Sequence, residues 1–285
     1  MKVLLVGNIY GGDAGANFYM IMQKLVHGFA RNGHAVQVFN DREAARTATP
    51  LRSRKLGAAS ANRRLLEVAR NFRPDLVLLG HCEMISNATL DALRGIVPDV
   101  RIAYRNVDPI HDANNRQRIF DRMGSVDAIF VTTAGEGLRD FAGGRAEVRH
   151  MPNPVDPAVE TLRQFDRPAA ELPTDLFFGI SGLIRGGDGR VETARALQAR
   201  LPDIAFEVRG LDYPAVRGAA YFHRLGQARM GLNYSRVNDH YLYSSDRMAQ
   251  YTGCGLLTFV DRATGFGDLF AEDELALYSD LEDLA

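Results

Sequence analysis

The chain has 285 residues, of which 46% are apolar and 24% are charged. This composition suffices for ordinary buried cores and excludes an intrinsically disordered protein. The formal net charge of −1 excludes a global basic field of the kind that attracts nucleic acid or acidic membranes. The length predicts two domains of roughly 100–200 residues each.

The cysteines and the apolar runs favour a cytoplasmic protein. Cys82 and Cys254 are the only cysteines and lack zinc-ligand spacing, so we expect inert, buried, reduced thiols. The opening run of residues 1–7 is too short for a signal peptide. No stretch approaches the roughly 18 apolar residues of a membrane span. Peripheral contact with the inner face of the membrane is kept as an alternative.

A basic stretch of the sequence is relevant to this peripheral membrane contact. Residues 42–73 carry nine arginines and lysines. They form either a solvated helix face with its loop, or a surface for an anionic acceptor or lipid.

The first half of the chain alternates between strand and helix patterns. Residues 2–6 form a buried strand ended by Gly7, residues 17–32 carry apolar side chains at helical spacing, and residues 36–39 form a second strand. The pattern continues with strands at 76–79, 101–104, 128–132 and 147–151, and with helices at 62–71, 87–94, 116–123 and 136–141. This alternation predicts a doubly wound domain around a parallel sheet.

Prolines interrupt the alternation in the middle of the chain. Five of them fall between residues 152 and 173. Because proline removes backbone donors and stiffens the chain, residues 156–174 are predicted to link a domain at 1–155 to a domain at 175–285. The second domain resumes with strands at 176–180, 205–209, 230–234 and 256–260, and with helices at 191–201, 221–228 and 245–252.

The segment 244–259 is the most informative motif. A serine-rich loop opens a helix, the helix ends at the run Gly253, Cys254 and Gly255, and an apolar strand follows. Here the chain resembles the GT-B glycosyltransferases, in particular the "glycosyl transferases group 1" C-terminal domain of CgeB-like proteins. The resemblance covers residues 175–285 and implies an α/β fold with two Rossmann-like domains facing across a cleft. GT-B proteins usually finish with helices that return to the first domain. This chain ends where a helix begins, so we expect either truncated C-terminal helices or a minimal variant.

Helix N-termini and fixed positive charge are what a nucleotide diphosphate needs. Ser244 and Ser245 open the helix and offer hydroxyls and amides, and Arg247 has a guanidinium suited to phosphate. The alternative is a plain helix cap beside a surface arginine. The family usually has glutamates at the positions of Leu242 and Gln250, the latter holding the ribose hydroxyls. Gln250 retains one acceptor but not the charge.

A second candidate phosphate loop, residues 179–190, joins a strand to a helix. In the resembling enzymes this loop carries a basic residue that stabilises the departing diphosphate. Arg185 and Arg190 are the candidates, beside Gly182, and flanking glycines favour Arg185. The alternative is a flexible surface loop. Arg209 and Tyr243 complete the expected nucleotide contacts. No Asp-x-Asp motif occurs, so we expect no metal and no cofactor.

Loops of the first domain would line the acceptor side of the cleft. The loop after the first strand has glycines at 7, 11, 12 and 15, a spacing that disfavours a dinucleotide oxidoreductase. Tight turns explain these glycines equally well. Polar residues also follow two later strands, and the candidates to orient or deprotonate an acceptor hydroxyl are Gly11, Gly12, Asp13, His81, Asp108 and His111.

The resulting hypothesis is a metal-independent glycosyltransferase. It would move a sugar from a nucleotide-diphosphate-sugar to a glycan, lipid or protein acceptor, with retention of configuration. The resemblance implies a role in polysaccharide biosynthesis. A catalytically inactive nucleotide-sugar-binding protein and another nucleotide-dependent α/β enzyme, such as an epimerase or oxidoreductase, are the alternatives.

Overall fold

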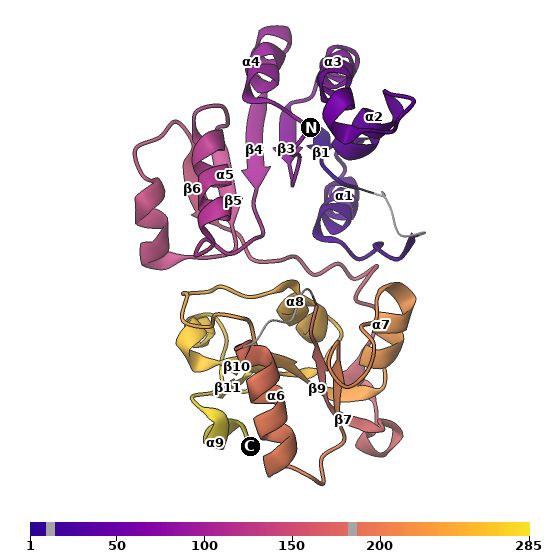
Figure 1. Cartoon of the computed structure of the whole chain (residues 1–285), viewed down its shortest axis with the longest axis vertical. Coiled ribbons are helices and arrows are strands. Elements are labelled where there is room, and N and C mark those ends of the chain that lie inside the picture. The colour runs from indigo at the N-terminus through magenta and orange to yellow at the C-terminus, as the bar shows by residue number, and fades with distance from the viewer. Residues whose placement is uncertain (10–14, 182–186) are drawn as a thin grey trace. The chain divides into compact units, whose positions relative to one another are not determined.

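The computed structural model describes residues 1–9, 15–181 and 187–285. The chain forms two compact units, Met1–Pro152 and Asn153–Ala285. Each has its own parallel sheet (Figure 1), and each has its own buried cores.

The first unit is built on a sheet of six parallel strands. In the order β2-β1-β3-β4-β5-β6, these are Ala35–Phe39, Lys2–Val6, Leu76–Leu79, Arg101–Arg105, Ala128–Val131 and Glu147–His150. The helices are α1 (Ile21–Arg31), α2 (Asp41–Thr47), α3 (Arg54–Phe72), α4 (Asn87–Ile96), α5 (Ala113–Met123) and the 3-10 helix η2 (Gly135–Phe141).

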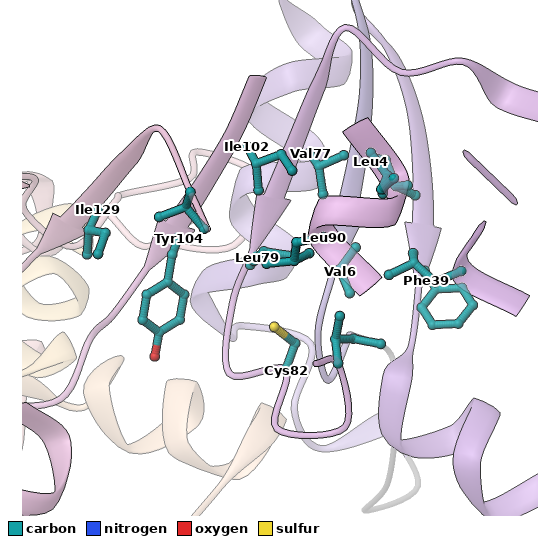
Figure 2. Packing of buried hydrophobic residues seen from close by; sticks show 14 of the residues in the cluster. Leu4, Val6, Phe39, Val77, Leu79, Cys82, Leu90, Ile102, Tyr104 and Ile129 are labelled. Carbon is teal, nitrogen blue, oxygen red and sulfur yellow. The ribbon is translucent and has the colours of Figure 1, made fainter. Parts of the chain in front are cut away.

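Alternation along the strands gives this sheet two apolar faces. On one face, side chains such as Leu4, Val77 and Ile102 pack with the helices α2 to α5 (Figure 2). On the other face, Val3 and Leu78 pack against α1. Successive strand residues point to opposite faces, so a strand buried on both sides reads as an unbroken apolar run.

The second unit has five parallel strands in the order β11-β10-β9-β7-β8. These are Ala276–Tyr278, Leu257–Asp261, Ala228–Asn233, Thr174–Gly179 and Phe206–Arg209. Helices α6 (Gly189–Arg200) and α9 (Leu281–Leu284) cover one face, and α7 (Gly218–Leu225) and α8 (Asp246–Gly253) cover the other.

Both sheets share one winding. The chain first adds a strand on one side and then returns past its starting strand, so the order reverses between β1 and β3 in the first unit and between β7 and β9 in the second. At such a reversal the connections leave in opposite directions, and a crevice opens at the carboxyl ends of the two strands. Each unit therefore has one switch-point crevice.

Helices α2 and α3 differ most from the sequence-based expectation. The predicted helix at 62–71 is the second half of α3, and α2 was not predicted. The α2–α3 contact is formed by small residues, with Gly57 packed against the backbone of Ala45. Because small residues carry little apolar signal, the periodicity of this contact is weak. Asn40 and Ser53 cap the two helices by accepting from Glu43 and Leu56 backbone N–H groups.

The predicted linker, residues 156–174, lies within the second unit. It contains the short 3-10 helices η3 (Gln164–Asp166) and η4 (Ala169–Glu171). The Gln164 side chain donates to the Ala228 carbonyl at 2.8 Å, and Arg167 donates to the Gly226 carbonyl at 2.6 Å. Proline prevents long helices here, but polar side chains still attach the segment to the unit. The predicted helix at 136–141 is likewise a 3-10 helix, η2.

Candidate functional site

The switch-point crevice of the second unit is bridged by Arg247, in the first turn of α8. Its Nη1 donates to the carbonyl of Gly179, at the end of β7, at 2.8 Å. Its Nη2 donates to the carbonyl of Tyr234, just after β9, at 2.6 Å. The guanidinium also lies over the ring of Phe178, 5.1 Å from its centroid. Arg247 is thus held at the place where ligands of doubly wound sheets bind.

No carboxylate of the described residues neutralises Arg247. Its Nε is buried and has no hydrogen-bond partner there. Burial lowers the pKa of Arg247, whereas interactions with Tyr251 and Tyr221 raise it. A desolvated cation without a counter-ion is costly. An anion placed in the crevice would offset that cost and complete the donor set of the guanidinium.

The other two described arginines predicted at this site are already paired. Arg190 is buried and forms an ion pair with Asp188, with Nη2 and Oδ2 at 2.6 Å. The hydrogen bond from Arg190 lowers the pKa of Asp188, which also caps α6. Arg209 pairs with Glu207 and stacks on Tyr213, 4.8 Å from the ring centroid. Structural ion pairs thus occupy both guanidinium groups.

The residues just before and just after the first turn of α8 are mostly buried. Ser245 is the N-cap residue but makes no capping side-chain hydrogen bond; its hydroxyl lies 3.4 Å from Asn233 Oδ1. Ser244 is buried and Tyr243 is half-buried. Gln250 accepts from the Tyr221 hydroxyl at 2.7 Å and donates to Asp246 at 2.8 Å. The amide of Gln250 is therefore engaged within the unit.

The first unit carries a cavity of about 370 Å³ at its own switch point, which we call the switch cavity. Asn8, Gly80, His81 and Asp108 line it from the carboxyl ends of β1, β3 and β4. The Met22 side chain packs directly on Gly80, where a Cβ would lie 2.8 Å from the Met22 sulfur.

His81 and Asp108 come together in the switch cavity. His81 Nε2 lies 3.6 Å from Asp108 Oδ2, and the same carboxylate oxygen accepts from Arg118 Nη1 at 3.4 Å. An imidazole beside a carboxylate can orient a hydroxyl or accept its proton. Asp108 thus has His81 on one side and Arg118 on the other, and these two partners fix its carboxylate in the wall of the cavity.

Sequence reasoning missed the side chains that hold these groups in place. Arg118 is one, and Arg42 is another, paired with Glu83 at 3.1 Å. The fully buried Asp41 accepts from the Met84 backbone N–H at 3.1 Å and so ties α2 to the loop after β3. Burial raises the pKa of Asp41. The contact between Asp41 and Met84 spans 43 residues and that between Arg118 and Asp108 spans 10, so no local pattern could reveal them.

Several predicted residues lie elsewhere. Gly11, Gly12, Asp13, Gly182 and Arg185 lie outside the described residues. His111 is exposed in the turn before α5 and lines neither the switch cavity nor the cavity next to it. Cys82 and Cys254 are buried free thiols, and burial raises the pKa of Cys82 to about 12. Within residues 1–9, 15–181 and 187–285, no group of three or more potential ligands is placed to hold a metal ion.

The basic stretch at 42–73 is partly paired. Arg42 binds Glu83, and Arg46 and Arg52 lie 3.9 Å and 3.4 Å from Glu43.

Part of the second unit is similar to a known protein family. Residues 190–285 match the family model described as "Glycosyl transferase-like". The matched segment contains Arg190, Arg209 and Arg247 together with all of α8. The sequence matches none of the curated proteins with which it was compared.

Solved structures share the fold of the whole chain. HepE of Anabaena, in complex with UDP and glucose, aligns with a TM-score of 0.54 at 14% identity, covering 100% of this chain and 88% of that one. The α,α-trehalose 6-phosphate synthase of Burkholderia multivorans aligns with a TM-score of 0.58 at 11% identity, covering 99% and 89%. A trehalose-6-phosphate synthase studied with bisubstrate glycomimetics gives 0.54 at 10% identity, covering 99% and 89%.

Residues 190–285 are thus similar to glycosyl transferase-like proteins, and the whole chain shares the fold of these solved structures. The two doubly wound units correspond to two Rossmann-like domains, as in the GT-B fold. None of the described helices is both long enough and apolar enough to cross a membrane.

Proposed function

We propose that the protein is a glycosyltransferase that moves a sugar from a nucleotide-diphosphate-sugar to a hydroxyl of a glycan, lipid-linked or protein acceptor. The bond between the anomeric carbon and the diphosphate oxygen breaks, and a bond from that carbon to the acceptor oxygen forms. The acceptor proton leaves with the nucleoside diphosphate. The observation that carries the proposal is Arg247, a desolvated cation at the switch point that has no carboxylate partner among the described residues.

The donor would lie in the second unit. A diphosphate beside Arg247 gains a charge-assisted hydrogen bond and the positive end of the α8 dipole. Ser244 and Ser245 add polar groups at the same helix end. Arg185 would neutralise the leaving phosphate, as the resemblance implies. HepE was solved with UDP and glucose, so UDP-sugars are the first donors to try.

The acceptor would lie in the switch cavity of the first unit. His81 and Asp108 would orient its hydroxyl there. The resemblance favours retention, in which the departing phosphate takes the proton and no strong base is needed. A trehalose-6-phosphate synthase of the same fold has been studied as a case of glycosyl transfer with retention. The anomeric configuration of the product, read by NMR, tests this part of the proposal.

Two finer parts of the proposal have their own tests. Transfer is proposed to be metal-independent, so EDTA should leave the rate unchanged and added Mg²⁺ or Mn²⁺ should not raise it. Peripheral membrane contact through the basic stretch at 42–73 is tested by sedimentation with vesicles containing anionic lipid. Binding there should weaken with salt, because exposed charges are screened within about 10 Å at 0.1 M ionic strength.

The second candidate is a protein that binds nucleotide-sugars without transferring them. It is favoured by Gln250, which stands where the family has glutamate and whose amide is engaged by Tyr221 and Asp246. Thermal shift and release of sugar from a panel of nucleotide-sugars separate the two candidates. Stabilisation with slow hydrolysis or transfer supports the enzyme, and stabilisation alone supports the binding protein. If no nucleotide stabilises the chain, both proposals fail.

A further inference from the structure

A second cavity adjoins the switch cavity in the first unit. It has a volume of about 480 Å³ and lies against α5, so we call it the α5 cavity. His81, Glu83 and Arg118 line both cavities. Both volumes fall in the range of roughly 300–1,000 Å³ that binds small ligands. The two cavities are therefore neighbouring compartments with one shared wall.

We propose that the acceptor is an oligosaccharide, with its reacting sugar in the switch cavity and its next sugar in the α5 cavity. The inference rests on the proposed function and specifies the acceptor of that site. The transfer chemistry is unchanged: the acceptor oxygen replaces the diphosphate oxygen on the anomeric carbon.

The walls of the α5 cavity are joined to each other. Arg122 of α5 donates to Asn87 Oδ1 at 2.6 Å and to the Ile85 carbonyl at 2.6 Å, across the cavity rim. Asn87 in turn donates to the Asp121 carbonyl at 2.6 Å. These bonds connect α5 to the loop and helix that follow β3. Because the cavity is preformed, its walls do not have to become ordered when a ligand binds, and the entropic cost of binding is lower.

Most charged side chains around the two cavities are engaged by protein partners. Arg42 pairs with Glu83 at 3.1 Å and Arg118 with Asp108 at 3.4 Å. Arg105 and Arg122 donate to uncharged protein acceptors. Hydroxyl groups both donate and accept, so they can bond to such groups without separating them from their partners.

Both compartments combine polar groups with apolar surface, as a sugar ring does. Met20, Met22 and Val107 line the switch cavity. Tyr104 lines the α5 cavity, and Figure 2 shows its hydroxyl pointing away from the labelled aliphatic side chains. Burial raises the pKa of Tyr104 to about 12, so its hydroxyl stays neutral. The hydroxyl oxygen accepts from Asn106 Nδ2 at 3.2 Å, and the hydroxyl keeps its proton to donate to a ligand.

The experiment compares matched acceptors of increasing length. The probes are p-nitrophenyl glycosides of glucose, galactose, mannose and N-acetylglucosamine, each as mono-, di- and trisaccharide, with UDP-sugars and GDP-sugars as donors. We expect kcat/KM for the preferred disaccharide to exceed that of its monosaccharide at least tenfold. Asp121→Trp, which fills the α5 cavity from an exposed position on α5, should abolish this preference.

Two further variants make the result specific. Gln117→Trp places the same side chain one turn earlier on α5, at an exposed position outside both cavities, and should keep the preference. Tyr104→Phe removes only a hydroxyl and should reduce the preference without a large loss of thermal stability. Equal use of mono- and disaccharides, or a preference that survives Asp121→Trp, overturns the inference.

Failure of the inference can be told apart from failure of the proposed function. If no glycoside in the panel is glycosylated while UDP or GDP still stabilises the chain against heat, the acceptor class is wrong and nucleotide binding stands. If no nucleoside diphosphate stabilises the chain, the proposed function itself is wrong.

Discussion

Arg247 Nη1 donates to the Gly179 carbonyl oxygen at 2.8 Å and thereby joins α8 to the end of β7. The second hydrogen bond of this guanidinium, to the carbonyl of Tyr234, reaches the other side of the same crevice. One side chain thus spans the switch point of the second unit while retaining unused donors for a ligand. This arrangement combines a structural role with a place in the proposed donor site.

Replacing Arg247 should therefore affect both nucleotide binding and stability. We expect Arg247→Ala to lower kcat/KM about 100-fold or more, because a charge-assisted contact to the diphosphate is lost. Arg247→Lys keeps the charge but cannot bond to both carbonyls, so it should retain part of the nucleotide-induced thermal shift. Arg229→Ala is the control, since Arg229 pairs with Asp175 at the amino ends of their strands. Equal activity of Arg247→Ala and wild type would remove Arg247 from the donor site.

Installing the family's glutamate at position 250 should not improve this protein. In Gln250→Glu, a carboxylate would lie against Asp246 in place of the amide that now donates to it. The loss of that donor and the new repulsion should cost roughly 2–3 kcal/mol. Asp246→Asn should restore stability in the double variant, which calorimetry can measure. A tighter Kd for UDP in Gln250→Glu would instead show that this side chain reaches the nucleotide.

Acid should destabilise the second unit through Glu207. Burial alone would raise the pKa of Glu207, but hydrogen bonds from Arg224 and Arg209 outweigh burial and lower it. A lowered folded pKa contributes stability that is complete above the unfolded value of 4.5 and is lost as the pH falls through the folded value. We expect Glu207→Gln to lose about 3 kcal/mol at pH 7 and to show a shallower decline in Tm below pH 4.5.

The control for this prediction is Glu171→Gln, which removes an exposed partner of Arg167 at 3.7 Å. Exposed ion pairs contribute little, so its Tm profile should follow that of the wild type. If the Tm of Glu207→Gln declines below pH 4.5 as steeply as that of the wild type, other carboxylates dominate the pH dependence.

The α2–α3 contact predicts a large effect from a single methyl group. In Gly57→Ala the new Cβ would lie 1.8 Å from the Ala45 carbonyl oxygen, so the two helices must move apart. We expect a loss of about 3 kcal/mol in the first unit, at the upper end of overpacking costs. Gly28→Ala is the matched control within α1, where a Cβ meets nothing within 4 Å. That variant should gain about 0.5–1 kcal/mol from helix propensity. Denaturant unfolding monitored by circular dichroism measures both.

Local patterns were enough to predict much of the fold. The apolar run Lys2–Val6 and the helical spacing of α1 are properties of a few consecutive residues, and the strands and helices lie close to where they were expected. The helix that follows Ser245 was identified from its own sequence, as was its resemblance to glycosyltransferases. Periodicity was weak only where small residues form the contact, as at Gly57 in α3.

The sequence by itself therefore determined the two alternating α/β halves and the polar residues at their strand ends. Tertiary structure decided which of these groups have partners. Arg190 pairs with Asp188 only two residues away, whereas Arg247 reaches Gly179 across 68 residues and pairs with no carboxylate in the described part of the chain. His81 meets Asp108 because β3 and β4 are adjacent in the sheet. The physical reason is that secondary structure follows from local periodicity, while pairing and desolvation depend on neighbours that only strand order brings together.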